Sequence, residues 1–190
     1  MKKIIRTASL AALVAVSSMS VANAEPFKGT YIGAQAGWQH NHVKSNIRGL
    51  KIKNGQDDFL WGANIGMSTV SANGVFMAGE VNFDFTTGGH DTVFTPGLTA
   101  KLGYRFSPNF VLAAKAGVTY NSYRFKALGY TSHRKSRFGF VPGVEALYSV
   151  NEHNIIGLSY QYTFHNNIHF GGVKVKPTSH AVTAKYAYKF

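Results

Sequence analysis

The chain alternates apolar and polar residues over much of its length, with the two-residue period that is typical of β-strands. The closing stretch, HAVTAKYAYKF at residues 180–190, puts Val182, Tyr186 and Phe190 on one face and Lys185 on the other. Seven more alternating segments precede it, at about residues 30–38, 59–68, 75–85, 98–106, 112–121, 138–149 and 156–164. Each segment has about the 9–11 residues that a tilted strand needs to cross a bilayer.

The connections between these segments alternate in length. Short, turn-like connections follow the second, fourth and sixth segments, at residues 71–74, 107–109 and 151–154. Longer loops are expected after the first, third, fifth and seventh segments, at about residues 40–58, 87–92, 122–135 and 165–178. This arrangement predicts an all-β fold: an eight-stranded antiparallel transmembrane up-and-down β-barrel with short periplasmic turns and long extracellular loops.

Aromatic residues at both ends of the apolar stripes favour this barrel over a soluble β-sandwich. Trp38 and Trp61 fall toward the long-loop end, and Tyr104 and Phe106 fall toward the turn end. Two aromatic belts that flank a band of aliphatic residues place the stripe in lipid, whereas a sandwich has no reason to separate its aromatic residues in this way.

Two prolines fit the barrel less well, because a closed barrel has no free edge strand to accommodate them. Pro96 and Pro142 both fall inside alternating segments or just before them, near the long-loop end. Each is therefore expected to mark the start of a strand or a β-bulge.

The first 24 residues are expected to be a cleaved signal peptide. They combine the basic residues Lys2, Lys3 and Arg6 with a short apolar run and a small-residue ending at Ala24. Residues 25–190 then form one predicted domain, the barrel, in the bacterial outer membrane. The chain has no cysteine, so disulfides do not hold it together. Beyond the leader, no apolar run is long enough for a membrane-spanning helix.

Five charged residues share a position on the polar faces, each five residues from the turn end of its strand: Glu80, Lys101, Lys115, Glu145 and Lys185. An eight-stranded barrel is just wide enough for its side chains to fill it, and charges inside it must pair. We therefore expect the two glutamates to bridge the three lysines in a lumen plug, with Asp84 and Arg105 extending this ion network. The alternative is that these charges line a gated ion path.

The segments GTYIGAQAGW, TPGLTAKLGYRFSPN and AKYAYKF resemble those of the small outer-membrane β-barrel proteins of the opacity-protein and OmpA-like "porin family". The resemblance covers the whole chain after the leader and implies the same eight-stranded barrel. In AKYAYKF it also implies a C-terminal assembly signal, carried by Tyr186, Tyr188 and Phe190, that the barrel-assembly machinery reads. These motifs indicate the fold far better than the activity.

Eleven basic residues fall in the predicted extracellular loops, in a chain with a net charge of +12: Lys44, Arg48, Lys51, Lys53, Arg124, Lys126, Arg134, Lys135, Arg137, Lys174 and Lys176. We expect them to bind outer-membrane lipids and the phosphates of lipopolysaccharide, and so to support the integrity of the envelope. The alternative is an opacity-like adhesin that binds a host glycosaminoglycan or serum protein, because SHRKSR is a basic cluster of the kind that binds sulfated sugars. Nucleic acid is not an expected partner.

Catalysis and a wide pore are disfavoured. A lipid A deacylase of this size needs a His and a Ser two residues apart on one strand face, so that the imidazole can activate the hydroxyl. The sequence has no such pair, and Ser179 and His180 are neighbours that point to opposite faces.

Most histidines, including His40 and His42, fall on the extracellular side. Nothing in their spacing fixes a metal site, so no metal or cofactor is expected.

Overall fold

The structure is a computed structural model that describes residues 25–47, 50–88, 91–124, 134–165, 168–170 and 173–190. Most of these residues lie in strands: β1 (Gly29–Ile47), β2 (Leu50–Val70), β3 (Val75–Gly88), β4 (Asp91–Ser107), β5 (Phe110–Arg124), β6 (Arg134–Ser149), β7 (Asn154–His165), β8 (Ile168–Phe170) and β9 (Val173–Lys189). The expected signal peptide, residues 1–24, lies outside the described residues, as do Arg48 and Lys126. No helix in the described part is long and apolar enough to cross a membrane.

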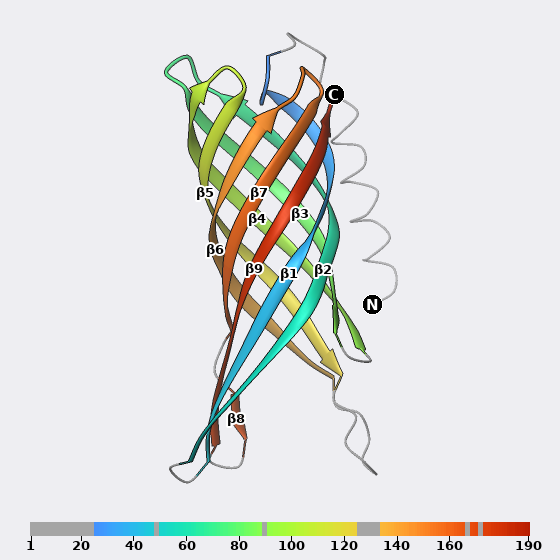
Figure 1. Ribbon diagram of the computed structural model, residues 1–190, viewed down its shortest axis with the longest axis vertical. Helices are drawn as coiled ribbons and strands as arrows, with labels where there is room; N and C mark the ends of the chain where they lie inside the picture. Colours follow the sequence, from blue (N-terminus) through green and yellow to red (C-terminus); the bar gives the residue numbers. More distant parts are fainter. Residues whose placement is uncertain (1–24, 48–49, 89–90, 125–133, 166–167, 171–172) are drawn as a thin grey trace, which may run out of the picture.

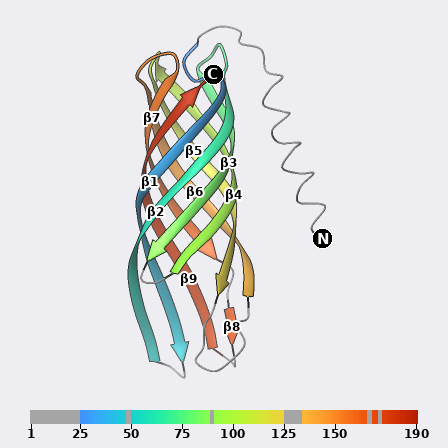
Figure 2. The same cartoon turned by 90° about the vertical axis from the view of Figure 1, so that its right-hand side faces the viewer.

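Eight of the strands described here form one closed antiparallel wall (Figure 1). Strands β1 to β7 pair in chain order, and β9 pairs with both β7 and β1, which closes the barrel. Among the described strands, the short β8 pairs with the start of β9 alone, on the side away from β1, at the end opposite the C-terminus (Figures 1 and 2). The predicted eight-stranded up-and-down barrel is confirmed.

The wall strands direct their apolar residues outward. In β9, Val182, Tyr186 and Tyr188 are between 41% and 50% exposed, while Thr183 and Lys185 on the other face are buried. Strand β3 alternates between exposed and buried positions in the same way over most of its length. A surface this rich in large apolar side chains is stable only in contact with lipid.

Aromatic residues contact one another at both ends of this outer surface, between neighbouring strands at one end and within β4 at the other. Toward the long loops, Trp38 packs edge-on against Phe59, with 6.1 Å between ring centres. Toward the short turns, Tyr104 packs edge-on against Phe106 at 5.2 Å. The aromatic residues therefore lie in the two belts that the sequence predicted.

The strands extend further toward the long-loop end than the sequence pattern predicted. Residues 40–58, expected to be a loop, instead continue β1 to Ile47 and begin β2 at Leu50, paired without a break. Strand β9 likewise begins at Val173, inside the predicted 165–178 loop. The apolar alternation ends where contact with lipid ends, but backbone pairing does not require it, so the pattern underestimated these strands.

The opposite end matches the prediction more closely. Short connections at residues 71–74, 108–109 and 150–153 join the strands there. The expectation for Pro96 is wrong: it lies inside β4, which begins at Asp91, and it pairs with Phe83 in an unbroken ladder to β3, although the ladder to β5 begins only at the next residue, Gly97. The expectation for Pro142 is wrong: it lies inside β6, and the ladder to β7 keeps the same register on both sides of it.

Candidate functional site in the barrel lumen

Four charged side chains from four strands meet in the lumen, and we call them the ion cluster: Glu80 (β3), Lys101 (β4), Glu145 (β6) and Lys185 (β9). Lys101 Nζ lies 3.0 Å from Glu80 Oε2 and 2.5 Å from Glu145 Oε2. Lys185 Nζ lies 3.8 Å from Glu145 Oε1 and also pairs with Glu80. The four side chains are at most 3% exposed. Each charge therefore faces two charges of opposite sign.

Polar side chains around Glu80 complete its hydrogen bonding. The Tyr31 hydroxyl donates to Glu80 Oε2 at 2.9 Å, and the Asn82 amide donates to Glu80 Oε1 at 2.6 Å. Lys185 Nζ also lies 5.2 Å from the centre of the Tyr31 ring. Taking a charge out of water costs several kcal/mol, and such contacts are what offsets that cost.

The structure brings together four of the seven residues expected in this network. Lys115 lies directly across from Lys101 in the β4–β5 ladder, but it takes no part in the ion pairs found among the described residues. Asp84 accepts a hydrogen bond from the Gln35 amide at 2.5 Å instead. Arg105 lies nearer the turn end, where its Nη1 is 2.8 Å from Glu25 Oε1. It lies four positions along β4 from Lys101, so it is too far down the barrel to join the ion cluster.

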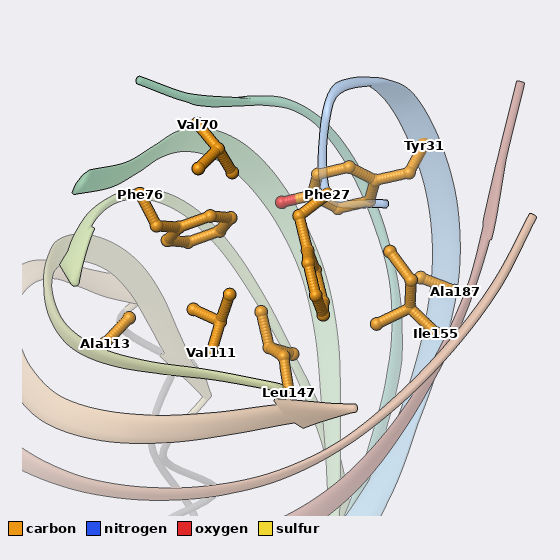
Figure 3. Packing of buried hydrophobic residues seen from close by; sticks show 9 residues of the cluster. All are labelled: Phe27, Tyr31, Val70, Phe76, Val111, Ala113, Leu147, Ile155 and Ala187. Atoms are coloured by element: carbon orange, nitrogen blue, oxygen red, sulfur yellow. The ribbon is translucent and has the colours of Figure 1, made fainter. Parts of the chain in front are cut away.

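Between the ion cluster and the short turns, apolar side chains fill the lumen (Figure 3). We call this layer the apolar cluster: Phe27, Tyr31, Val70, Phe76, Val111, Ala113, Leu147, Ile155 and Ala187. The Phe27 ring stands edge-on to Phe76 at 6.2 Å, a favourable aromatic geometry. A cavity of about 20 Å³ remains between the two layers, lined by Phe27 and Phe76 on one side and by Lys101 and Lys185 on the other, and it has room for about one water molecule.

Strict alternation does not predict the apolar cluster, because it assigns the inward face to polar residues. The available signal is a pair of places where alternation fails near a turn, Val75-Phe76-Met77 and Phe110-Val111-Leu112. In each triplet the outer residues face lipid, so the middle residue must point inward. Phe27 carries no such signal, since it precedes the first strand.

Five of the predicted polyanion-binding residues come together through strand register at the long-loop end. Lys44 of β1 pairs with Lys53 of β2 on one side and with Lys176 of β9 on the other. Two residues further along β1, the paired positions on the neighbouring strands are Lys51 and Lys174. We call these five residues the lysine ladder. It sets five bases on three adjacent strands.

A second basic group lies at the matching end of β5 and β6. Arg124 pairs with Arg134, and the next pairs toward the membrane bring in Lys135 and Arg137. The predicted loop bases thus form two groups on different parts of the barrel rim rather than one continuous patch.

Three histidines contact one another on β1 and β9. The His40 and His42 ring centres are 4.3 Å apart, and those of His42 and His180 are 5.9 Å apart. His40 pairs with Asp57, and the Tyr160 hydroxyl lies 2.7 Å from His180 Nδ1. Among the residues that the structure describes, no three potential ligands are placed to hold a metal ion.

The three residues of the expected assembly signal lie together at the short-turn end of the wall. Tyr186, Tyr188 and Phe190 are exposed on the outer surface, and the last two pack edge-on at 5.4 Å. The Phe190 amide donates to Thr30 O at 3.0 Å, so the end of the chain is held at the junction of β9 and β1. Recognition by the assembly machinery stays a prediction.

Comparisons with known proteins agree with this architecture. The chain matches the outer membrane protein beta-barrel domain family over residues 8–190. It is similar to Neisserial surface protein A, with 16% identity and a TM-score of 0.61 over 87% of this chain and 100% of that one. It is also similar to Ail, the attachment invasion locus protein of Yersinia pestis, with 18% identity and a TM-score of 0.50 over 84% and 99% of the two chains. It is similar, too, to the outer membrane protease OmpT of Escherichia coli, with 9% identity and a TM-score of 0.50 over 85% of this chain and 97% of that one. A search of curated proteins found no match. At these identities, the solved structures show a shared fold alone.

Proposed function

This chain belongs to the outer membrane protein beta-barrel domain family, and we propose that it is a non-enzymatic surface barrel whose basic rim binds polyanions, first of all the phosphates of lipopolysaccharide. The lysine ladder is the observation that carries the proposal. Its register sets Lys44, Lys53 and Lys176 side by side at the long-loop end, which is the outer side of the membrane. Lysines at paired backbone positions suit phosphate and sulfate ligands, because ammonium groups donate charge-assisted hydrogen bonds to their oxygens.

We further propose that the lumen does not conduct. The ion cluster and the apolar cluster support this, because together they leave a cavity of about 20 Å³ between them. An ion that entered would have to displace paired charges from their partners and then pass an apolar layer, and both steps are costly.

Binding to immobilised heparin tests the polyanion proposal. We expect the purified barrel to bind at low salt and to elute as salt rises, because added ions screen exposed charges. Replacing Lys44, Lys53 and Lys176 with Ala is expected to lower the eluting salt concentration. Replacing the same residues with Arg keeps the charge and is the matched control. Equal elution of the Ala variant and the parent would contradict the proposal.

The arginine-rich group on β5 and β6 supports the alternative, an adhesin for a host glycosaminoglycan or serum protein. Replacing Arg134, Lys135 and Arg137 with Ala tests it. Loss of binding to intact host cells, with unchanged binding to lipopolysaccharide vesicles, would favour the adhesin. Loss of vesicle binding in the lysine variant alone would favour lipopolysaccharide as the ligand.

A further inference from the structure

The residues just before β1 turn into the barrel mouth instead of leaving it. Phe27 is 1% exposed, and its ring lies among Phe76, Leu147 and Ile155 at the centre of the apolar cluster (Figure 3). No sequence pattern places an aromatic side chain there, since the residue belongs to no strand. The apolar cluster is therefore completed by a segment that is not part of the wall.

The backbone conformation of Phe27 is one that surrounding contacts must hold in place. Its φ angle is +64°, and among the described residues it is the only residue other than glycine with a positive φ. A side chain makes this left-handed conformation unfavourable, so it persists only where surrounding contacts hold it. Here those contacts are the buried ring and the hydrogen bonds on either side of it.

Charged groups fasten the segment to the wall. Arg105 Nη1 donates to Glu25 Oε1 at 2.8 Å, and Lys189 Nζ donates to Glu25 O at 2.7 Å. The Lys28 amide donates to Glu25 O at 3.3 Å and closes the turn around Phe27. The segment is thus held by β4 and by β9, the strand that closes the barrel.

We propose that Glu25–Lys28 is an intramolecular stopper that seals the periplasmic mouth. Phe27 fills the apolar cluster, and Glu25 holds it in place by bridging β4 and β9. With the ring in place, the space between the stopper and the ion cluster admits about one water molecule, so the buried charges are shielded from periplasmic water. This inference goes beyond the proposed surface function and does not depend on polyanion binding.

A single cysteine beneath the stopper tests it, because the chain has none of its own. Ser68 lines the cavity and is 5% exposed, and cysteine is close to it in size. The measurement is the rate at which a charged methanethiosulfonate reagent modifies Ser68→Cys in protein purified from outer membranes. We expect very slow labelling in the parent and a rise of at least about tenfold with Phe27→Ala, as opening of the mouth exposes the thiol.

Three further variants separate sealing from general loosening. Phe106→Ala removes an aromatic side chain from the outer surface at the same end and should leave labelling slow. Phe27→Leu keeps apolar bulk in the cluster and should also label slowly. Ser107→Cys, at the exposed end of β4, sets the rate for an open thiol. Folding is checked first by gel mobility, and Phe27→Val replaces Phe27→Ala if the latter does not fold. Unchanged slow labelling after truncation of Phe27, or labelling of the parent as fast as Ser107→Cys, would overturn the proposal.

Discussion

At the scale of single residues, the lumen depends on charges that are almost completely buried. Glu145 reaches both lysines of the ion cluster, and Glu80 is also held by Tyr31 and Asn82. A buried ion pair adds little net stability compared with apolar residues of the same size. Loss of one partner, however, leaves the other as an unpaired charge in a low-dielectric interior, which is strongly destabilising. The cluster is therefore more sensitive to one deletion than its net contribution suggests.

Replacing Glu80 or Glu145 with Ala is expected to destabilise the barrel by about 3–5 kcal/mol, because both lysines lose a counter-charge. The midpoint of urea unfolding in detergent micelles, followed by gel mobility, measures this. Glu152→Ala, in an exposed turn, is the matched control and should change the midpoint little. Wild-type stability in both cluster variants would contradict the role of the ion cluster.

The Glu25–Arg105 pair predicts a pH dependence of stability. The hydrogen bond from Arg105 holds the pKa of the Glu25 carboxyl below its usual value. The folded-state pKa is therefore lower than the unfolded one, so this contribution is present above the usual carboxyl pKa and is lost as the pH falls through the folded-state value. The Glu25 side chain is 38% exposed, which limits the effect to about 1 kcal/mol or less.

Thermal unfolding of the parent and of Glu25→Gln at about pH 7 and about pH 3 checks this dependence. We expect the parent to unfold at a higher temperature near neutral pH and the two proteins to converge in acid. A gap of equal size at both pH values would show that the carboxylate charge is not the cause.

The sequence predicted the ion cluster better than the stopper, for a physical reason. Glu80, Lys101 and Lys185 sit at inward positions of regular strands, so alternation and distance from the turn place them near one another. The position of Phe27 depends on tertiary packing and on a left-handed backbone, and neither leaves a local pattern. The pairing of Arg105 with Glu25 was missed because it involves the same segment.

At the scale of the strands, closure of the barrel brings β1 and β9 very close together. A Cβ atom added at Gly37 would lie 1.9 Å from Val182 O, which is backbone and cannot move aside. Glycine at this position therefore permits the close approach of the first and last strands. The sequence marks Gly37 as an inward residue but does not reveal that the position requires glycine, because the close approach arises only when the sheet closes.

Gly37→Ala is expected to destabilise the barrel by about 1–3 kcal/mol, because the added methyl group must push the two strands apart. Gly79→Ala is a matched control, since a Cβ there meets nothing within 4 Å. The fraction that refolds into lipid vesicles, read from gel mobility, reports the difference. Equal refolding of the two variants would show that β1 and β9 tolerate a wider spacing.

At the scale of the whole molecule, the closed lumen that we propose would have two barriers in series. The ion cluster lies in the lumen, and the apolar cluster, whose side chains Figure 3 shows, lies between it and the short-turn end. An open path requires both barriers to fail. The eight-stranded wall, the belts and the localisation could be predicted from periodicity, but the division of the lumen into two layers depends on side chains that alternation does not describe.

Planar bilayers test the series arrangement. We expect no steady conductance steps from the parent and few from Phe27→Ala or Glu145→Ala alone, with a clear increase in the double variant. Phe106→Ala combined with Glu145→Ala controls for general destabilisation. Steady nanosiemens-scale steps from the parent, as in a porin, would rule out a sealed lumen.

The unbroken pairing of β1 with β2 up to Ile47 and Leu50 has a consequence for the entropy of binding. A flexible loop must give up conformational freedom when it holds a ligand, at a cost of about 1–2 kcal/mol for each backbone residue that becomes ordered. The lysine ladder lies on strands whose backbone is already ordered, so a polyanion has only side chains to immobilise. The polyanion binding proposed for this rim would therefore cost little backbone entropy, because the paired strands are ordered before any ligand arrives.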